Sequence, residues 1–155
     1  MQPLPTEPPT GPAPGPAPGP RPGPSTLGSA SGDLGVARAL VVKLTCGLEA
    51  PERLSQGFTV AATAVASGVA VSLWLTGEAA WMAVPGRADA FSLPYAAPIT
   101  DLRDSVLSGG RMTLCSQCAA RRELSEDDLI EGVTIRGAAA FVEEVLQPGA
   151  QALVY

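Results

Sequence analysis

Two cysteines three positions apart are the residues of this sequence best suited to chemistry. Cys115 and Cys118 lie in the segment Arg111–Arg122, where a short strand predicted over 111–114 gives way to a helix that begins near Ser116. A thiol in the first turn of a helix faces unpaired backbone N–H groups and the positive end of the helix dipole, which favour the thiolate. Because the thiolate is the nucleophilic form of cysteine, Cys115 is the first candidate for a reactive group.

The spacing of these cysteines suits two kinds of chemistry. In a helix Cys118 lies one turn after Cys115 on the same face, close enough for a disulfide. The pair is therefore suited to carry either sulfur or electrons. The alternative is that both thiols are small buried apolar groups, because free cysteine is among the most buried residue types. Cys46 follows a strand predicted over 38–45 and is a weaker candidate, which approaches the pair only if the first and third strands are neighbours.

The composition of the 155-residue chain excludes several other kinds of site. Histidine is absent, which removes the usual general base and the commonest metal ligand. The three cysteines offer at most three sulfur ligands to zinc, so we expect no metal and no cofactor. A net charge of −5 argues against direct binding of nucleic acid. An odd number of cysteines without a secretory signal pattern favours a reducing compartment, and we expect the cytoplasm.

The N-terminal part of the sequence differs in composition from the rest. Its first 24 residues contain 11 of the 16 prolines, and a Ser/Gly-rich stretch follows. Such a segment cannot bury a core. We therefore predict a disordered Pro/Gly/Ser-rich extension over residues 1–35 and one α/β domain over residues 36–155.

The run Leu54–Gly77 contains no charged residue and is long enough to be tested as a membrane span. Several Thr, Ser, Gly and Gln residues interrupt it, and its composition changes from Ala-rich to rich in Val, Leu and Trp. That change indicates a buried helix followed by a buried strand. We expect no membrane span.

The predicted strands and helices alternate along the chain. Strands are expected over 38–45, 69–75, 111–114, 133–135 and 152–155, and helices over 52–66, 78–84, 101–108, from about 116, and over 138–146, with Thr100 capping the third of them. This alternation predicts a three-layer αβα fold with a mostly parallel five-stranded sheet. The carboxyl ends of parallel strands share one edge of a sheet, so Cys46, Thr76 and Cys115 are expected at that edge.

Other prominent side chains are expected to serve packing or solvation. We expect Trp74 and Trp81 in the core or at a subunit interface, Glu143 and Glu144 on the solvent-facing side of the last helix, and Arg121 and Arg122 on a solvated helical face.

The order of elements and several local strings resemble the DsrE/DsrF-like family, which includes sulfur-relay subunits. The resemblance extends over about 38–155 and rests on the strings Val71–Glu78, Gly109–Arg122, Glu131–Ala138 and the apolar strand that closes the chain. The string Cys115-x-x-x-Ala-Ala-Arg-Arg is similar to the segment that holds the persulfide-forming cysteine in active members. The departures from the family pattern are Cys118 and the Pro-rich extension.

The resemblance implies a sulfurtransferase subunit that carries sulfur as a persulfide on Cys115. It also implies sulfur donor and acceptor proteins as partners, and a homo- or hetero-oligomer. Cys118 is then a secondary candidate, because its thiol could attack the loaded Cys115 and release sulfide. Two alternatives stay open: a thiol-disulfide redox protein that uses Cys115 and Cys118, and a non-catalytic assembly or regulatory subunit of the same fold.

Overall fold

The computed structural model describes Gly11 and residues 38–155. The strands are β1 (Ala39–Leu44), β2 (Ala70–Leu75), β3 (Arg111–Cys115), β4 (Val133–Arg136) and β5 (Ala150–Val154). The helices are α1 (Pro51–Ala66), α2 (Ile99–Gly109), α3 (Ser116–Ala120) and α4 (Ala138–Val145), with short 3₁₀ helices η1 (Gly77–Ala83), η2 (Ala88–Ala90) and η3 (Glu126–Asp128). Apart from Gly11, the predicted extension over residues 1–35 lies outside the described residues, and the boundary at residue 36 stays a prediction.

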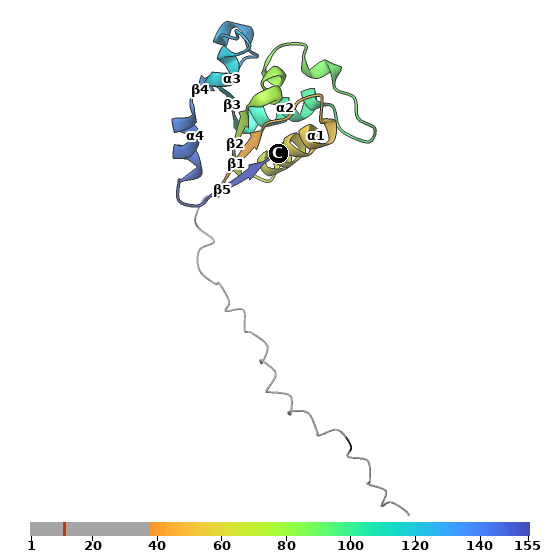
Figure 1. The fold of residues 1–155 in the computed structure, drawn as a ribbon, viewed down its shortest axis with the longest axis vertical. Coiled ribbons are helices and arrows are strands. Elements are labelled where there is room, and N and C mark those ends of the chain that lie inside the picture. The colour runs from red at the N-terminus through yellow and green to blue at the C-terminus, as the bar shows by residue number, and fades with distance from the viewer. Residues whose placement is uncertain (1–10, 12–37) are drawn as a thin grey trace, which may run out of the picture. The chain divides into compact units, whose positions relative to one another are not determined.

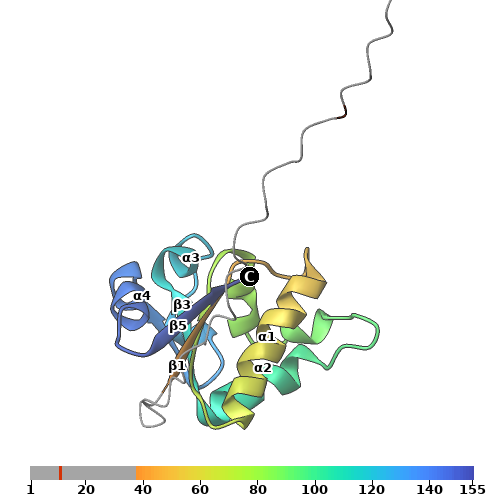
Figure 2. The same ribbon diagram turned by 90° about the horizontal axis from the view of Figure 1, so that it is seen from below.

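The five strands form one sheet in the order β4-β3-β2-β1-β5, and every pair of neighbours is parallel. Helices α1 and α2 cover one face of the sheet, and α3 and α4 lie on the other (Figures 1 and 2). The predicted three-layer αβα architecture is therefore confirmed. The sheet is parallel throughout the described residues, because each strand is followed by a crossover that returns the chain to the same end of the sheet.

The larger part of the core lies between the sheet and the helices α1 and α2. Leu44, Leu73 and Leu114 project from three neighbouring strands to this side and are fully buried. Phe58 meets them from α1 and is also fully buried. At Gly57 an added Cβ would overlap the side chain of Leu44, so the absence of a side chain lets α1 approach β1 closely.

The uncharged run of the sequence divides into a helix and a strand, as predicted. Helix α1 ends at Ala66, and Gly68 follows with a φ of 78°, a left-handed conformation that glycine adopts without strain. Strand β2 then begins at Ala70. Among the residues that the structure describes, no helix is both long and apolar enough to cross a membrane.

The start of α2 differs from the prediction. Pro98 occupies the N-cap position and Ile99 begins the helix, whereas Thr100 was expected to cap a helix beginning at residue 101. Proline is compatible with this position because a helix start leaves backbone N–H groups unpaired in any case. Ile99 is fully buried, so packing against the core favours the earlier start.

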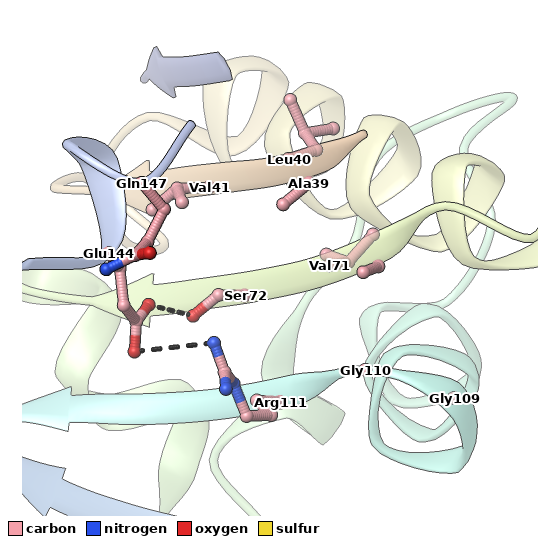
Figure 3. Close-up of a pocket in the computed structure, with 11 residues that line it drawn as sticks. Ala39, Leu40, Val41, Val71, Ser72, Gly109, Gly110, Arg111, Glu144 and Gln147 are labelled. Carbon is pink, nitrogen blue, oxygen red and sulfur yellow. Dashed lines mark hydrogen bonds and ion pairs between the residues drawn. The ribbon is translucent and has the colours of Figure 1, made fainter. Parts of the chain in front are cut away.

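Glu144 also differs from the prediction, which placed it on the solvent-facing side of α4. Its side chain is only 12% exposed and points to the sheet. Its carboxylate accepts hydrogen bonds from Ser72 Oγ at 2.6 Å and from Trp74 Nε1 at 2.9 Å. The same carboxylate pairs with Arg111 at 3.5 Å (Figure 3) and with Arg136 at 3.3 Å. Glu144 therefore connects α4 to three strands. Its carboxylate can stay charged although it is largely buried, because both of its oxygens have hydrogen-bond or ion-pair partners.

Candidate functional site

Cys115 lies at the junction between β3 and α3. It is the last residue of the strand and the N-cap residue of the helix, with φ −63° and ψ 126°. Cys115 is half-buried, in contrast to the buried Cys46 and Cys118. The structure thus places Cys115 at the carboxyl edge of a parallel sheet, as the sequence predicted.

The surroundings of Cys115 favour its thiolate form. Burial raises the pKa of the Cys115 thiol, but this effect is outweighed by hydrogen bonds to the thiolate from the backbone N–H and the thiol of Cys118 and from the backbone N–H of Gln117. The positive charge of Lys43 acts in the same direction. The pKa of Cys115 therefore lies below the ordinary value of 9.0. A larger fraction of nucleophilic thiolate is present near neutral pH than in an unperturbed cysteine.

Cys118 lies one turn further along α3 and is buried, with 6% of its surface exposed. The backbone N–H of Gly77 donates a hydrogen bond to its Sγ over 3.2 Å. Gly77 has a φ of 52°, and a Cβ at this position would collide with the carbonyl oxygen of Thr45. The turn after β2 therefore depends on glycine, and it holds Cys118 beside Cys115.

The position of Arg122 differs from the prediction, which placed this residue on a solvated helical face. Its side chain is 13% exposed, and its guanidinium donates to the Cys118 carbonyl oxygen at 3.2 Å and pairs with Glu78 at 2.6 Å. It also lies 5.6 Å from the ring centroid of Trp81. These contacts tie the end of α3 to η1. Arg121, in contrast, is exposed, as expected.

Cys46 lies apart from the cysteine pair. The strand that it follows, β1, is separated from β3 by β2, so the two strands are about 9.6 Å apart rather than adjacent. The condition under which Cys46 would approach the pair is therefore not met. Its side chain is 3% exposed, and burial raises the pKa of its thiol. Cys46 accordingly packs with the core.

The remaining residues predicted at this edge or in the core have structural contacts. Thr76 is buried, and its hydroxyl donates to the carbonyl oxygen of Leu44 at 2.8 Å. Trp74 is 1% exposed and meets Phe141 of α4 edge-on, with 5.3 Å between ring centroids. Trp81 is half-buried against the core. In the part of the chain that the structure describes, no three metal-ligating side chains gather at one place.

Lys43 is a residue that the sequence patterns did not single out. Its ammonium group lies 4.8 Å from the ring centroid of Phe141, and its charge acts on Cys115. The sequence does contain a signal, because Lys43 is the only lysine of the chain and interrupts an otherwise apolar strand. A charged residue at such a position requires a specific environment.

The fold and the site together define a class: three-layer α/β proteins with a thiolate-favouring cysteine at a strand-to-helix junction. The profile of the DsrE/DsrF-like family matches residues 40–155, and the chain therefore belongs to this family. Comparison with curated protein sequences gave no significant match.

Solved structures share the fold at low sequence identity. The crystal structure of the ychN protein from E. coli is 18% identical, with a TM-score of 0.64 over 77% of this chain and 100% of that one. MTH1491, a protein of unknown function from Methanobacterium thermoautotrophicum, is 13% identical, with a TM-score of 0.57 over 76% of this chain and 99% of that one. At these identities the similarity establishes the fold.

Proposed function

We propose that this protein is a cytoplasmic sulfur carrier that forms a persulfide on Cys115 and passes the sulfur to a partner protein. The observation that carries the proposal is the position of Cys115 in a member of the DsrE/DsrF-like family: a half-exposed thiol at the start of α3 with its pKa lowered by neighbouring hydrogen bonds and by Lys43. No metal or cofactor is needed for this chemistry, because a thiolate is itself a sufficient nucleophile.

The transfer consists of two exchanges at sulfur. The Cys115 thiolate attacks the outer sulfur of a donor persulfide, R–S–SH. The donor S–S bond breaks, R–S⁻ leaves, and Cys115–S–SH is formed. The thiolate of an acceptor then attacks the outer sulfur of Cys115–S–SH, which yields the acceptor persulfide and restores the Cys115 thiolate. No external oxidant or reductant is consumed, because each exchange breaks one S–S bond and forms another.

The partners in this proposal are donor and acceptor proteins together with further subunits. Large apolar side chains are exposed on α4, at its C-cap residue Leu146 and on β5: Val142 is 48% exposed, Leu146 75%, Leu153 40% and Val154 65%. Exposed large apolar side chains mark candidate protein interfaces. They support a homo- or hetero-oligomer in which these side chains are covered.

A thiol-disulfide redox protein is the second candidate. It is favoured by the position of Cys118 one helical turn after Cys115, from which the Cys118 thiol helps to lower the pKa of Cys115. Attack of Cys118 on the inner sulfur of Cys115–S–SH would break that S–S bond, release HS⁻ and leave a disulfide between the two residues. The same two sulfurs would then serve as an electron carrier.

Intact-protein mass spectrometry after incubation with a persulfide donor tests both candidates. The wild type, Cys115→Ser, Cys118→Ser and the matched control Cys46→Ser are measured before and after a thiol reductant. A reversible gain of one sulfur that is lost only in Cys115→Ser supports the carrier. Loss of two hydrogens that either Cys115→Ser or Cys118→Ser abolishes supports the redox protein. No change in any variant contradicts both and favours a non-catalytic subunit.

A further inference from the structure

The single lysine of the chain lies on the same face of the sheet as Cys115. Lys43 pairs in register with Trp74, and Trp74 with Thr113, so these three residues form a row across β1, β2 and β3. Cys115 is two positions beyond Thr113 on β3, and side chains two positions apart on a strand project to the same face. Lys43 and Cys115 are therefore separated by β2 and by two residues along the strands.

An aromatic pair directs the lysine toward the middle of the sheet. Phe141 of α4 packs edge-on against Trp74, and the Lys43 ammonium lies 4.8 Å from the Phe141 centroid. A cation is attracted to the face of an aromatic ring. Because Phe141 also contacts Trp74 of β2, the Lys43 ammonium lies beside an aromatic pair that includes a residue of the strand between β1 and β3. The four-carbon stem of lysine makes this reach possible.

The surrounding charges leave Lys43 available to an anion. Arg111 and Arg136 lie on the same face, and both pair with the one carboxylate of Glu144. Among residues 38–155, no carboxylate lies within salt-bridge distance of Lys43. Lys43, Arg111 and Arg136 are thus three cations on the face that carries Cys115, and two of them are paired with Glu144, in a protein whose net charge is −5.

We propose that Lys43 attracts and holds anionic sulfur donors in front of Cys115, so that the site selects negatively charged persulfides over neutral ones. This inference rests on the proposed function for the identity of the substrate, but not for the existence of the anion-attracting charge. Lys43 is half-buried, so part of the residue stays open to solvent and to a small ligand. The charge of Lys43 already acts on the Cys115 sulfur, which places the two groups within electrostatic reach.

The test compares an anionic with a neutral alkylating reagent at Cys115. Iodoacetate and iodoacetamide both react with the thiolate, so the ratio of their rates cancels the thiolate fraction and reports the attraction of an incoming anion. Peptide mass spectrometry follows Cys115 in the wild type, Lys43→Met, Lys43→Arg and the control Arg121→Met, which removes an exposed charge. We expect Lys43→Met to lower the ratio at least about threefold, as for one partly screened charge. Lys43→Arg and Arg121→Met should leave it near the wild-type value.

Chemical modification gives a second measurement that does not depend on the folding of a variant. Because Lys43 is the only lysine, acetylation of the folded wild type removes one side-chain ammonium, whereas reductive methylation retains its charge. Acetylation should lower the ratio and methylation should not. An unchanged ratio in both Lys43→Met and the acetylated protein would overturn the inference. If the ratio falls but no persulfide forms on Cys115, the anion-attracting charge stands and the carrier function fails.

Discussion

The backbone N–H of Gly77 donates to Sγ of Cys118 over 3.2 Å and so joins the turn after β2 to the helix that carries the second cysteine. The two residues are 41 positions apart in the sequence. Cys118 in turn helps to lower the pKa of the Cys115 thiol. A turn that depends on glycine therefore contacts the residue that favours the thiolate form of the proposed sulfur carrier.

Gly77→Ala should destabilise the protein and disturb the cysteine pair. The positive φ of Gly77 is unfavourable for alanine, and the added Cβ would collide with the Thr45 carbonyl. We expect a loss of about 2–4 kcal/mol in the free energy of unfolding. Gly68→Ala is the matched control, because Gly68 has a similar φ of 78° but open space around its Cα. Urea unfolding that gives equal losses for the two variants would show that the collision is unimportant.

Cys115 should be alkylated at a lower pH than Cys46. The pKa of Cys115 is lowered despite its burial, by hydrogen bonds from Cys118 and Gln117 and by Lys43, whereas burial raises the pKa of Cys46. Peptide mass spectrometry after brief exposure to iodoacetamide over a pH series gives both profiles. An earlier rise for Cys46, or coincident profiles, would contradict the proposed electrostatics of the site.

The same two cysteines should have opposite effects on stability as the pH changes. A lowered folded-state pKa favours the thiolate, so the stability contributed by Cys115 is present at pH values above 9.0 and is lost as the pH falls through its folded-state pKa. The raised pKa of Cys46 gives stability that is present below 9.0 and is lost as the pH rises through its own folded-state pKa. Urea unfolding of Cys115→Ser and Cys46→Ser against the wild type, from neutral pH to above 9.0, should show the two differences changing in opposite directions.

The architecture could be predicted from the sequence because local signals agreed with the fold. Strand β1 is an apolar run of the length of a buried strand, and α1 begins at Pro51 and ends before Gly68. The position of Cys115 at a strand-to-helix junction followed from the same boundaries. The order of the strands could not be predicted from the sequence, because it depends on which strands pack best beside one another over the whole sheet. The placement of β2 between β1 and β3, which separates Cys46 from the pair, became visible only in three dimensions.

Glu144 shows a second limit of sequence reasoning. It follows Glu143 on a helix, and two adjacent acidic residues on a short helix are typical of a solvent-exposed face. Its partners Ser72, Arg111 and Arg136 come from three different strands, so no local window contains the signal. Lys43 is similar, because its significance depends on Phe141, almost a hundred residues away.

Glu144→Gln should lower the free energy of unfolding by about 1–3 kcal/mol, because it removes the negative charge shared by Arg111 and Arg136 and leaves both without their partner. Glu143→Gln is the control one residue earlier on the same helix. Glu143 is exposed, so its substitution should change stability by no more than about 0.5 kcal/mol. Thermal and urea unfolding measure both. Equal effects would mean that the buried carboxylate does not fasten α4 to the sheet.

Cys118→Ser should lengthen the lifetime of the Cys115 persulfide. In the wild type the Cys118 thiolate can attack the inner sulfur of Cys115–S–SH and expel HS⁻, since α3 holds the two residues one helical turn apart. Serine preserves the size of the side chain but cannot form the disulfide. We expect sulfide release from the loaded protein to fall at least about tenfold, because a hydroxyl is a far weaker nucleophile than a thiolate near neutral pH.

The measurement is a time course of sulfide release together with the mass of the loaded protein, with Cys46→Ser as a control that removes a buried thiol from outside the pair. Release that is equally fast in Cys118→Ser and the wild type would show that Cys118 does not resolve the persulfide. Cys118 would then act through its hydrogen bond to the Cys115 thiolate, and its replacement by serine should still raise the pH at which Cys115 is alkylated. A hydroxyl is itself a hydrogen-bond donor, so that shift should be smaller in Cys118→Ser than in Cys118→Ala.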